Sequence, residues 1–220
     1  MKYILLTGAS GGLGYKLAEY LLNKNYCVIM LYNTHDNLDK LVSKYPNSLK
    51  YKIDITNEDE IIKLKKYLDS INIKIDILIN NAGIDHVSDV SLKNKNTFTK
   101  VYEVNAVSAF LMIKYFGDEI DNNQGYILNI SSDNTDNNYD IVTLEYDMSK
   151  SALNMLTKEY ARYYKNAHVN SILFGWLDTN MNNIPEDMKK YIKFVSFDRA
   201  CMEVYEMINN NSSGLFKIVN

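Results

Sequence analysis

The chain has 220 residues, 46% of them hydrophobic, and a formal net charge of −3. This size suits one substantial core, and we expect a single domain over residues 1–220. The weakly acidic balance argues against nucleic-acid binding, and no apolar run approaches the roughly 20 residues of a membrane helix. Cys27 and Cys201 lack the spacing of a disulfide framework or a zinc site. We therefore expect a cytoplasmic protein with no metal and with no nucleic-acid or membrane partner.

Short apolar runs alternate along the chain with stretches of helical periodicity. We expect strands at residues 3–6, 27–32, 49–53, 76–79, 125–130, 168–173 and 216–219. Helices are predicted between them, at 14–23, around 38–42, and at 58–70, 97–119 and 146–165. Buried strands that alternate with helices indicate a doubly wound α/β fold: a mostly parallel sheet of six or seven strands with helices on both faces. The polar segments 133–140 and 178–196 are predicted to be loops.

The turn after the first predicted strand is rich in glycine. It reads Thr7-Gly8-Ala9-Ser10-Gly11-Gly12-Leu13-Gly14. Glycines in such a turn bring backbone N–H groups close to a pyrophosphate and let the following helix pack against the strand. The N-terminus of that helix adds partial positive charge for the phosphates. A purely structural turn can also use glycine, but the position directly after the first strand favours a dinucleotide site.

Further motifs follow this turn in an ordered series. They are Asp54-Ile55, Asn80-Asn81-Ala82-Gly83, Asn105, Ser131-Ser132, Tyr146-Asp147-Met148-Ser149-Lys150-Ser151-Ala152 and Gly175-Trp176-Leu177-Asp178-Thr179. With them the chain resembles the short-chain dehydrogenase/reductase family in its short form, and it is similar to 3-oxoacyl-carrier-protein reductase-like members. The resemblance implies a Rossmann fold and an oxidoreductase that transfers hydride between a nicotinamide cofactor and a carbonyl or alcohol substrate.

Tyr146 and Lys150 lie four residues apart, so they project from one face of a helix. A nearby ammonium group stabilises tyrosinate and lowers the tyrosine pKa from its ordinary value of about 10. The resemblance implies that Tyr146 is the catalytic acid/base, that Lys150 also binds the nicotinamide ribose, that Ser132 binds the substrate oxygen and that Asn105 holds a water of the proton path. Ser131 is the alternative to Ser132, but side chains alternate along a strand and Ser131 would face away.

The resemblance also implies the cofactor contacts. They are Gly8, Ser10, Gly12, Leu13, Gly14, Asn33, Thr34, Asp54, Ile55, Asn81, Ala82, Gly83, Tyr146, Lys150, Gly175, Leu177 and Thr179. NAD-preferring members often carry an acidic residue at the end of the second strand, where this chain has Tyr32, and that difference favours NADP. NAD stays open, because Gly11 stands where NADP-preferring members often have arginine.

The segment from 178 to 196 corresponds to the family's lid over the substrate, and it is shorter than usual. Phe174 replaces the proline that usually precedes Gly175. Apolar lid residues either line a substrate pocket or form the inner face of a short helix; they are Met181, Ile184, Met188, Tyr191 and Ile192. The substrate itself is not identified beyond a small carbonyl or alcohol.

Two other functions compete with the dehydrogenase. A non-catalytic NAD(P)-binding or redox-sensing protein is disfavoured, because regulators commonly lose the tyrosine or the lysine. A dehydratase or epimerase tends to have a different glycine spacing and a larger C-terminal domain. The resemblance further implies a homodimer or homotetramer that assembles through the predicted helices at 97–119 and 146–165.

Overall fold

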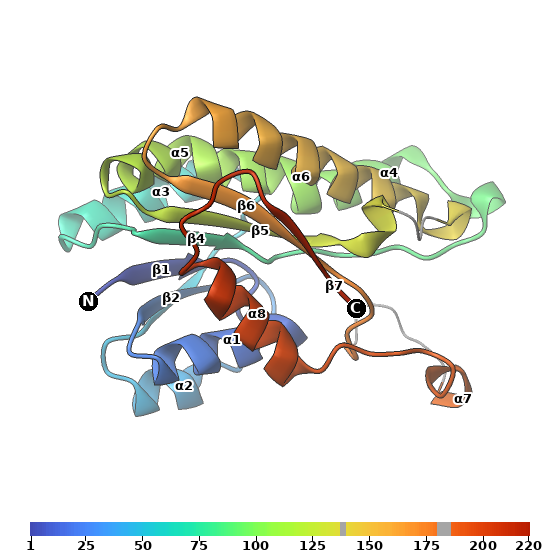
Figure 1. Cartoon of the computed structure of the whole chain (residues 1–220), viewed down its shortest axis with the longest axis horizontal. Helices are drawn as coiled ribbons and strands as arrows, with labels where there is room; N and C mark the ends of the chain where they lie inside the picture. The colour runs from blue at the N-terminus through green and yellow to red at the C-terminus, as the bar shows by residue number, and fades with distance from the viewer. Residues whose placement is uncertain (137–139, 180–185) are drawn as a thin grey trace.

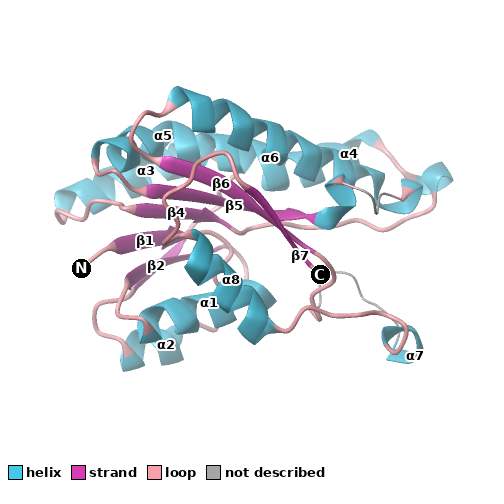
Figure 2. Cartoon of the chain, viewed as in Figure 1, coloured by secondary structure: helices cyan, strands magenta, loops and turns pink. Residues whose placement is uncertain are grey.

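Seven parallel strands form the centre of the molecule. The computed structural model describes residues 1–136, 140–179 and 186–220. The strands are β1 (Tyr3–Leu6), β2 (Cys27–Tyr32), β3 (Leu49–Lys52), β4 (Ile77–Asn80), β5 (Tyr126–Ser132), β6 (His168–Phe174) and β7 (Phe216–Val219). They pair in the order β3-β2-β1-β4-β5-β6-β7 (Figure 2), and each of these pairs is parallel. The predicted doubly wound α/β fold is confirmed.

Helices cover both faces of the sheet (Figure 1). One face carries α1 (Gly12–Asn23), α2 (Asp39–Lys44) and α8 (Phe197–Met207), and the other carries α3 (Glu58–Ser70), α5 (Ser108–Asn122) and α6 (Leu144–Tyr163). Side chains of β1 alternate between the two cores, because Ile4 and Leu6 pack on the first face and Leu5 on the second. Burial on both faces explains why the strands are apolar throughout. Within the described residues, none of the helices combines the length and apolarity needed to cross a membrane.

The predicted helix at 97–119 is divided in the structure. α4 (Lys95–Tyr102) leads into a π-helical turn at Glu103–Val107, and α5 follows. The turn contains Asn105, a buried residue whose side chain bonds the backbone of Ile84. Single π-helical turns within α-helices are rare and occur frequently at functional sites. The apolar periodicity continues on both sides of this turn, so the sequence pattern does not reveal it.

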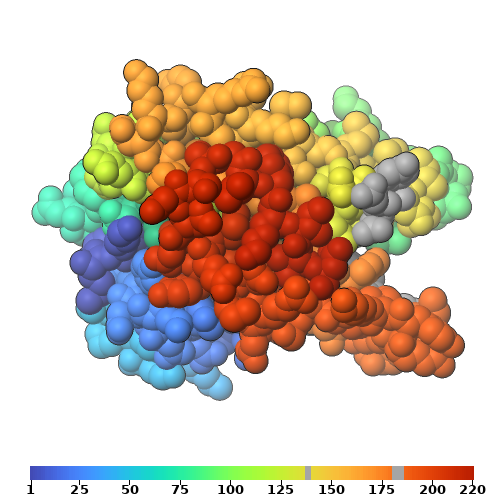
Figure 3. All heavy atoms as spheres, viewed as in Figure 1, coloured from blue at the N-terminus to red at the C-terminus, as the bar shows by residue number. Residues whose placement is uncertain are grey.

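The C-terminal part of the chain contains α7 (Glu186–Lys189), a short helix within the predicted lid as one of the two alternatives there expects, and α8, which the sequence pattern above does not predict. α8 begins after Ser196, whose hydroxyl accepts a hydrogen bond from the Arg199 N–H (3.2 Å). Its buried residues Ala200, Val204 and Met207 join the core beside α1. In Figure 3 the C-terminal segment covers the middle of the near face, and α7 projects from the body of the molecule.

The order of the strands determines where a ligand can bind. After β3 the chain returns to the other side of β1 to form β4. The chain after β1 therefore leads to a helix on one face of the sheet and the chain after β4 to helices on the other, and such a switch point defines a crevice outside the strand ends. In open α/β sheets, ligands bind in this crevice. The glycine-rich turn follows β1 and the Asn81-Ala82-Gly83 segment follows β4, so both predicted motifs border the crevice.

Candidate active site

The glycine-rich turn packs directly against the loop after β4. Gly8 has a φ of +65°, and a Cβ there would lie 2.8 Å from the Cα of Ala82. A Cβ on Gly14 would lie 2.1 Å from the carbonyl oxygen of Gly8 and 2.9 Å from the Asn81 Nδ2. Real Cβ atoms do not make such contacts, so glycine is needed at both positions. The two predicted motifs thus form one surface.

Hydrogen bonds from Thr7 and Asn81 hold this surface together. The Thr7 hydroxyl accepts from the N–H groups of Asn81 and Ala82, each at 3.0 Å. The Asn81 Nδ2 in turn donates to the carbonyl oxygens of Thr7 (2.9 Å) and Gly8 (3.2 Å). The side chains of both residues are therefore occupied in fixing the loops, while the glycines keep the surface open.

The N-terminus of α1 suits an anion. Its N-cap residue is Gly11, which supplies no side-chain hydrogen bond, and its first turn contains no acidic residue. By contrast, α3 is capped by the Asn57 side chain and has three acidic residues in its first turn. Free N–H groups and the helix dipole at α1 fit the pyrophosphate of a dinucleotide. Thr179 stands opposite, because a Cβ on Gly12 would lie 3.2 Å from its Cγ2.

The predicted adenosine contacts lie further along the same sheet edge. Asn33 and Thr34 are exposed in the loop after β2. Asp54 follows β3 and accepts hydrogen bonds from the N–H (2.9 Å) and hydroxyl (2.7 Å) of Thr56 in its own turn. Ile55 packs against the core beneath α3 and α5. The structure thus places these residues near the expected end of the crevice, and it ties Asp54 to local contacts.

A carboxylate that the sequence analysis does not consider lies beside the end of β2. Asp36 accepts a hydrogen bond from the Tyr32 hydroxyl, which raises the pKa of Tyr32. Lys50 from β3 contacts both Asp36 (2.5 Å) and Asp39 (2.6 Å). These bonds lower the pKa of Asp36 and raise that of Lys50, so both of these groups are charged at neutral pH. The end of β2 is therefore more acidic than residues 32–34 alone suggest.

Asn105 connects the loop after β4 to α6. Its Oδ1 accepts from the Ile84 N–H (2.8 Å), and its Nδ2 donates to the Ile84 carbonyl (2.9 Å) and to the Ser149 hydroxyl (2.9 Å). Ser149 donates to the backbone carbonyl of Tyr146 at 2.7 Å. Both backbone groups of Ile84 are thus held by one side chain, and that side chain also reaches the helix that carries the predicted acid/base.

The structure brings Ser132 and Tyr146 together. The Ser132 hydroxyl at the end of β5 lies close enough to Tyr146 on α6 to lower the pKa of that tyrosine. Ser132 also accepts from the Asn134 N–H at 3.3 Å. The alternative residue, Ser131, points into the protein, and its buried hydroxyl has no hydrogen-bond partner among the described residues. The geometry therefore favours Ser132, as strand alternation predicts.

Lys150 is buried behind Tyr146. It is 4% exposed, its ammonium donates to the Ile130 carbonyl (2.8 Å), and it lies 5.5 Å from the centre of the Tyr146 ring. A Cβ on Gly83 would lie 3.4 Å from the Lys150 Nζ, so the loop after β4 passes directly beside the ammonium. Burial lowers the pKa of Lys150 to about 8, against a smaller opposing effect of Asp85.

The electrostatic state of Tyr146 differs from the sequence-based expectation. Its pKa is raised, mainly by burial and then by the charge of Asp85, with smaller contributions from Asp147 and Asp133; the hydrogen bond from Ser132 opposes the shift. The lowering of this pKa that is expected from Lys150 is outweighed by burial and by the acidic neighbours. Tyr146 is therefore protonated at neutral pH, which suits a proton donor.

The Gly175 segment closes the site from the side of β6. Gly175 donates to the Val219 carbonyl (2.9 Å), and a Cβ there would lie 3.4 Å from the Asp133 Oδ2. Leu177 forms a parallel bridge with Val195, which ties the two ends of the predicted lid together. Lid residues 180–185, including Met181 and Ile184, lie outside the described residues. Met188 and Tyr191 are exposed, so the structure places neither in a pocket.

The sequence model of the short chain dehydrogenase family matches residues 2–190. The chain belongs to this family. It is 38% identical over 136 residues to a 3-oxoacyl-[acyl-carrier-protein] reductase of Buchnera aphidicola, a match that covers 60% of the chain and 55% of the relative. It is 30% identical over 207 residues to an NAD-dependent glycerol dehydrogenase of Listeria innocua, with 87% and 79% covered.

The fold comparison agrees with the sequence comparison. A solved structure of 4-hydroxyisoleucine dehydrogenase complexed with NADH superimposes with a TM-score of 0.91 at 26% identity, and 100% of this chain and 97% of that one are covered. Some curated relatives are longer, so that the chain spans about half their length. Short-chain dehydrogenases are oxidoreductases that bind nicotinamide cofactors, and the glycine turn, the uncapped α1 and the loop after β4 fit such a cofactor.

Two features of this short-chain dehydrogenase escape the motif analysis. Asp85 follows the Asn-Asn-Ala-Gly motif and acts on the pKa values of both Tyr146 and Lys150. Lys93 and Glu145 form an ion pair at 2.5 Å in which the lysine side chain is 10% exposed and the glutamate 0%. Their positions are 52 residues apart, so no local pattern pairs them. In the sequence, this ion pair is indicated only by an acidic residue directly before Tyr146 and by a lysine ten residues after the Asn-Asn-Ala-Gly motif.

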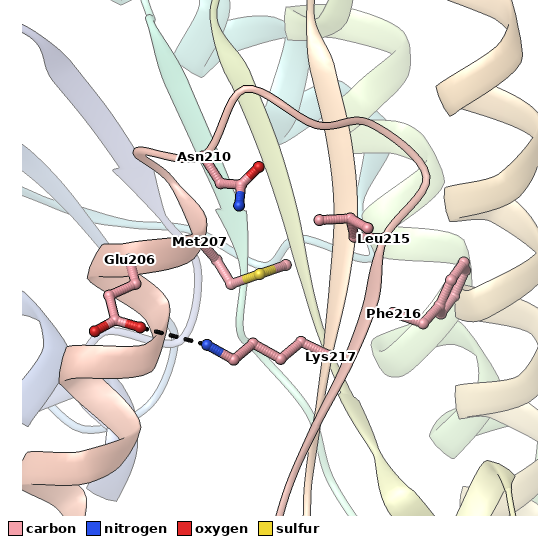
Figure 4. Close-up of a pocket in the computed structure, with 6 residues that line it drawn as sticks. All are labelled: Glu206, Met207, Asn210, Leu215, Phe216 and Lys217. Carbon is pink, nitrogen blue, oxygen red and sulfur yellow. Dashed lines mark hydrogen bonds and ion pairs between the residues drawn. The ribbon is translucent and has the colours of Figure 1, made fainter.

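A hollow lies between α8 and β7, and none of the predicted site residues lines it among the residues that the structure describes (Figure 4). The Lys217 ammonium points across it to Glu206 (3.4 Å) and also pairs with Glu203. Met207 and Leu215 contribute apolar surface. The one cation in this hollow is already neutralised, and no predicted site residue lines it.

Proposed function

We propose that this chain is an NAD(P)-dependent oxidoreductase that reduces a carbonyl or oxidises an alcohol. The observation that carries the proposal is the assembly of Asn105, Ser132, Tyr146 and Lys150 near the carboxyl ends of β4 and β5. When bound, the nicotinamide supplies or accepts the hydride. The glycine turn, the N-terminus of α1 and the loop after β4 would hold its dinucleotide.

The residues of the chain handle the proton. In the reduction, Ser132 holds the carbonyl oxygen and Tyr146 donates a proton to it as the carbon accepts hydride, so that an alcohol and a tyrosinate result. Lys150 stabilises the tyrosinate by its charge and returns a proton towards it. Asn105 orders the path behind Lys150 by holding both backbone groups of Ile84. In the oxidation the same proton moves from the alcohol to Tyr146.

Some residues near the end of β2 favour NADP and others favour NAD. The absence of an acidic residue at positions 32–34 favours NADP, and Lys40 lines a hollow beside Ser10 together with Tyr15 and Asn37. Asp36 and Asp39 favour NAD, because they neutralise Lys50 and repel a 2′-phosphate. A side-by-side titration with NADH and NADPH separates the two: tighter NADPH supports our expectation of NADP, and tighter NADH assigns the preference to the aspartates.

Assembly as a homodimer or homotetramer is part of the proposal. The outer faces of α5 and α6 carry exposed apolar side chains: Val107 just before α5, Phe110, Met148, Met155 and Tyr163. Such residues on neighbouring helices suit a self-complementary interface. Light scattering on the purified chain tests this, with a dimer or tetramer as the expected mass.

The test of the function is turnover. The purified chain is expected to oxidise NADH or NADPH in the presence of members of a panel of ketones and aldehydes. A non-catalytic dinucleotide-binding protein, the competing candidate, would bind the cofactor and oxidise it with none of them. No observation on the site favours that candidate.

A further inference from the structure

Asp85 occupies a fixed position beside the Tyr146–Lys150 pair. It directly follows Ile84, whose N–H and carbonyl are both bonded by Asn105, at 2.8 and 2.9 Å. Two residues earlier, Gly83 passes against the Lys150 ammonium. The backbone on the N-terminal side of Asp85 is therefore held by the same groups that build the site.

The carboxylate of Asp85 retains free acceptor capacity. Among the described residues it accepts one hydrogen bond, from the N–H of the adjacent His86 to Oδ1 (2.7 Å). Its side chain is neither fully buried nor fully exposed. The carboxylate thus retains acceptor positions for a further hydrogen bond.

Asp147, a neighbouring carboxylate on α6, is bonded more fully than Asp85. Asp147 accepts from the Asn134 side chain (2.8 Å) and the Thr143 hydroxyl (2.9 Å). Glu145 is paired with Lys93. Both carboxylates belong to the buried start of α6, whereas Asp85 lies on the loop at the mouth of the site.

The charges around Asp85 come from several elements. Asp147 and Glu145 on α6 and burial raise its pKa, while Lys93 and the His86 N–H lower it. Its own charge raises the pKa of Tyr146 and opposes the lowered pKa of Lys150, so the carboxylate lies within electrostatic reach of both reacting groups. The Asn105 bonds to Ile84 and the contact of Gly83 with Lys150 place the backbone before Asp85 beside the same two groups.

We propose that Asp85 selects the substrate, by accepting a hydrogen bond from a hydroxyl or ammonium group close to the reacting carbon. This inference rests on the proposed function, because it requires that Ser132 and Tyr146 bind the reacting oxygen. A carboxylate binds such donors and repels an anion at the same place. Hydroxyketones, aminoketones and the corresponding alcohols are the preferred substrates, and ketoacids with the carboxylate beside the carbonyl are disfavoured.

The test compares small ketones that differ in one group. Reduction of acetone, hydroxyacetone, aminoacetone and pyruvate is measured with the better of NADH and NADPH at saturation. A hydrogen bond to a charged group contributes enough for a difference of about tenfold or more. Wild-type kcat/KM is expected to be at least about tenfold higher for hydroxyacetone or aminoacetone than for acetone, with pyruvate the poorest substrate.

Two variants at Asp85 locate the preference. Asp85→Ala removes the acceptor and is expected to bring hydroxyacetone and aminoacetone to within about twofold of acetone, while acetone is still reduced. Asp85→Asn keeps a neutral acceptor, so it retains part of a preference for the hydroxyl and loses a preference for the ammonium. Comparison of hydroxyacetone with aminoacetone in the two variants thus identifies whether Asp85 binds a hydroxyl or an ammonium group. Asp89→Asn, an exposed aspartate on the same loop, is the matched control.

The possible outcomes distinguish a failure of the role proposed for Asp85 from a failure of the proposed oxidoreductase function. Equal wild-type rates for acetone and the donor-bearing ketones would overturn the role of Asp85 and leave the oxidoreductase in place. The same follows if Asp85→Ala lowers kcat/KM for every ketone by one factor, because that is the signature of a purely structural residue. Cofactor binding with no reduction of any ketone in the panel would overturn both.

Discussion

The two halves of the crevice present different chemical groups. On the β1 side, the surface consists of backbone: glycines at positions 8, 12 and 14 and an uncapped helix, with few ionisable groups. On the side of β4, β5 and α6, it consists of buried and half-buried titratable side chains, among them Tyr146, Lys150, Asp85 and the Lys93–Glu145 pair.

This difference follows from what each half has to do. A pyrophosphate carries a fixed charge and needs only N–H groups at close range, which glycine and a helix N-terminus provide. A proton transfer needs groups whose pKa values lie away from their ordinary values, and burial produces such shifts. The first half should therefore be sensitive to added volume, and the second to changes of charge.

The largest effect on stability is expected at the buried ion pair. Lys93→Met leaves the Glu145 carboxylate without its partner in a site with no exposure, and removal of one member of a buried pair costs about 3–5 kcal/mol. Urea unfolding measures the loss. The control is Lys114→Met, which breaks the exposed pair with Glu58 and should cost about 1 kcal/mol or less. Equal losses in the two variants would mean that the buried pair has no special role.

Added volume should damage the backbone half. Gly14→Ala places a Cβ 2.1 Å from the Gly8 carbonyl oxygen, so the turn must move, which costs about 1–3 kcal/mol of stability and weakens cofactor binding. Gly11→Ala is the matched control, because its φ is −78° and its Cβ would meet nothing closer than 3.4 Å. Calorimetry and a cofactor titration on both variants check this. If Gly14→Ala behaves like Gly11→Ala, the close packing of the two loops is not required.

A smaller effect is expected from the titration of Lys150. Its pKa of about 8 in the folded protein lies below the ordinary 10.5, so the unfolded chain binds more protons between these values. Stability contributed by this group therefore rises with pH from about 8 to about 10.5. Unfolding of wild type and Lys150→Met across this range should show the rise in the wild type alone. A parallel pH dependence of the two proteins would contradict the lowered pKa.

The motif residues of the site, from both halves, could be predicted from the sequence because the constraints on them are local. Gly8 and Gly14 are required by contacts within one turn and its neighbour, and Tyr146 and Lys150 by the period of a helix. The parallel sheet followed from apolar strands. α8 was missed although its signals are present: Ser196 as a cap and buried residues at Ala200, Val204 and Met207.

Other features depend on contacts that no local pattern contains. The π-helical turn at Asn105 exists where a side chain bonds Ile84, 21 residues away. The raised pKa of Tyr146 depends on Asp85 and on burial, which the spacing of tyrosine and lysine does not report. Asp36 reaches Tyr32 only because the loop after β2 turns back. Such features required the tertiary structure.

The central claim is that one half of the crevice binds the cofactor while the other moves the proton. Tyr146→Phe tests it most directly, because it removes one hydroxyl and leaves the backbone half untouched. We expect cofactor affinity to stay within about threefold of wild type while kcat falls by about 100-fold or more, in line with the loss of a general acid. Turnover that survives in Tyr146→Phe would contradict it.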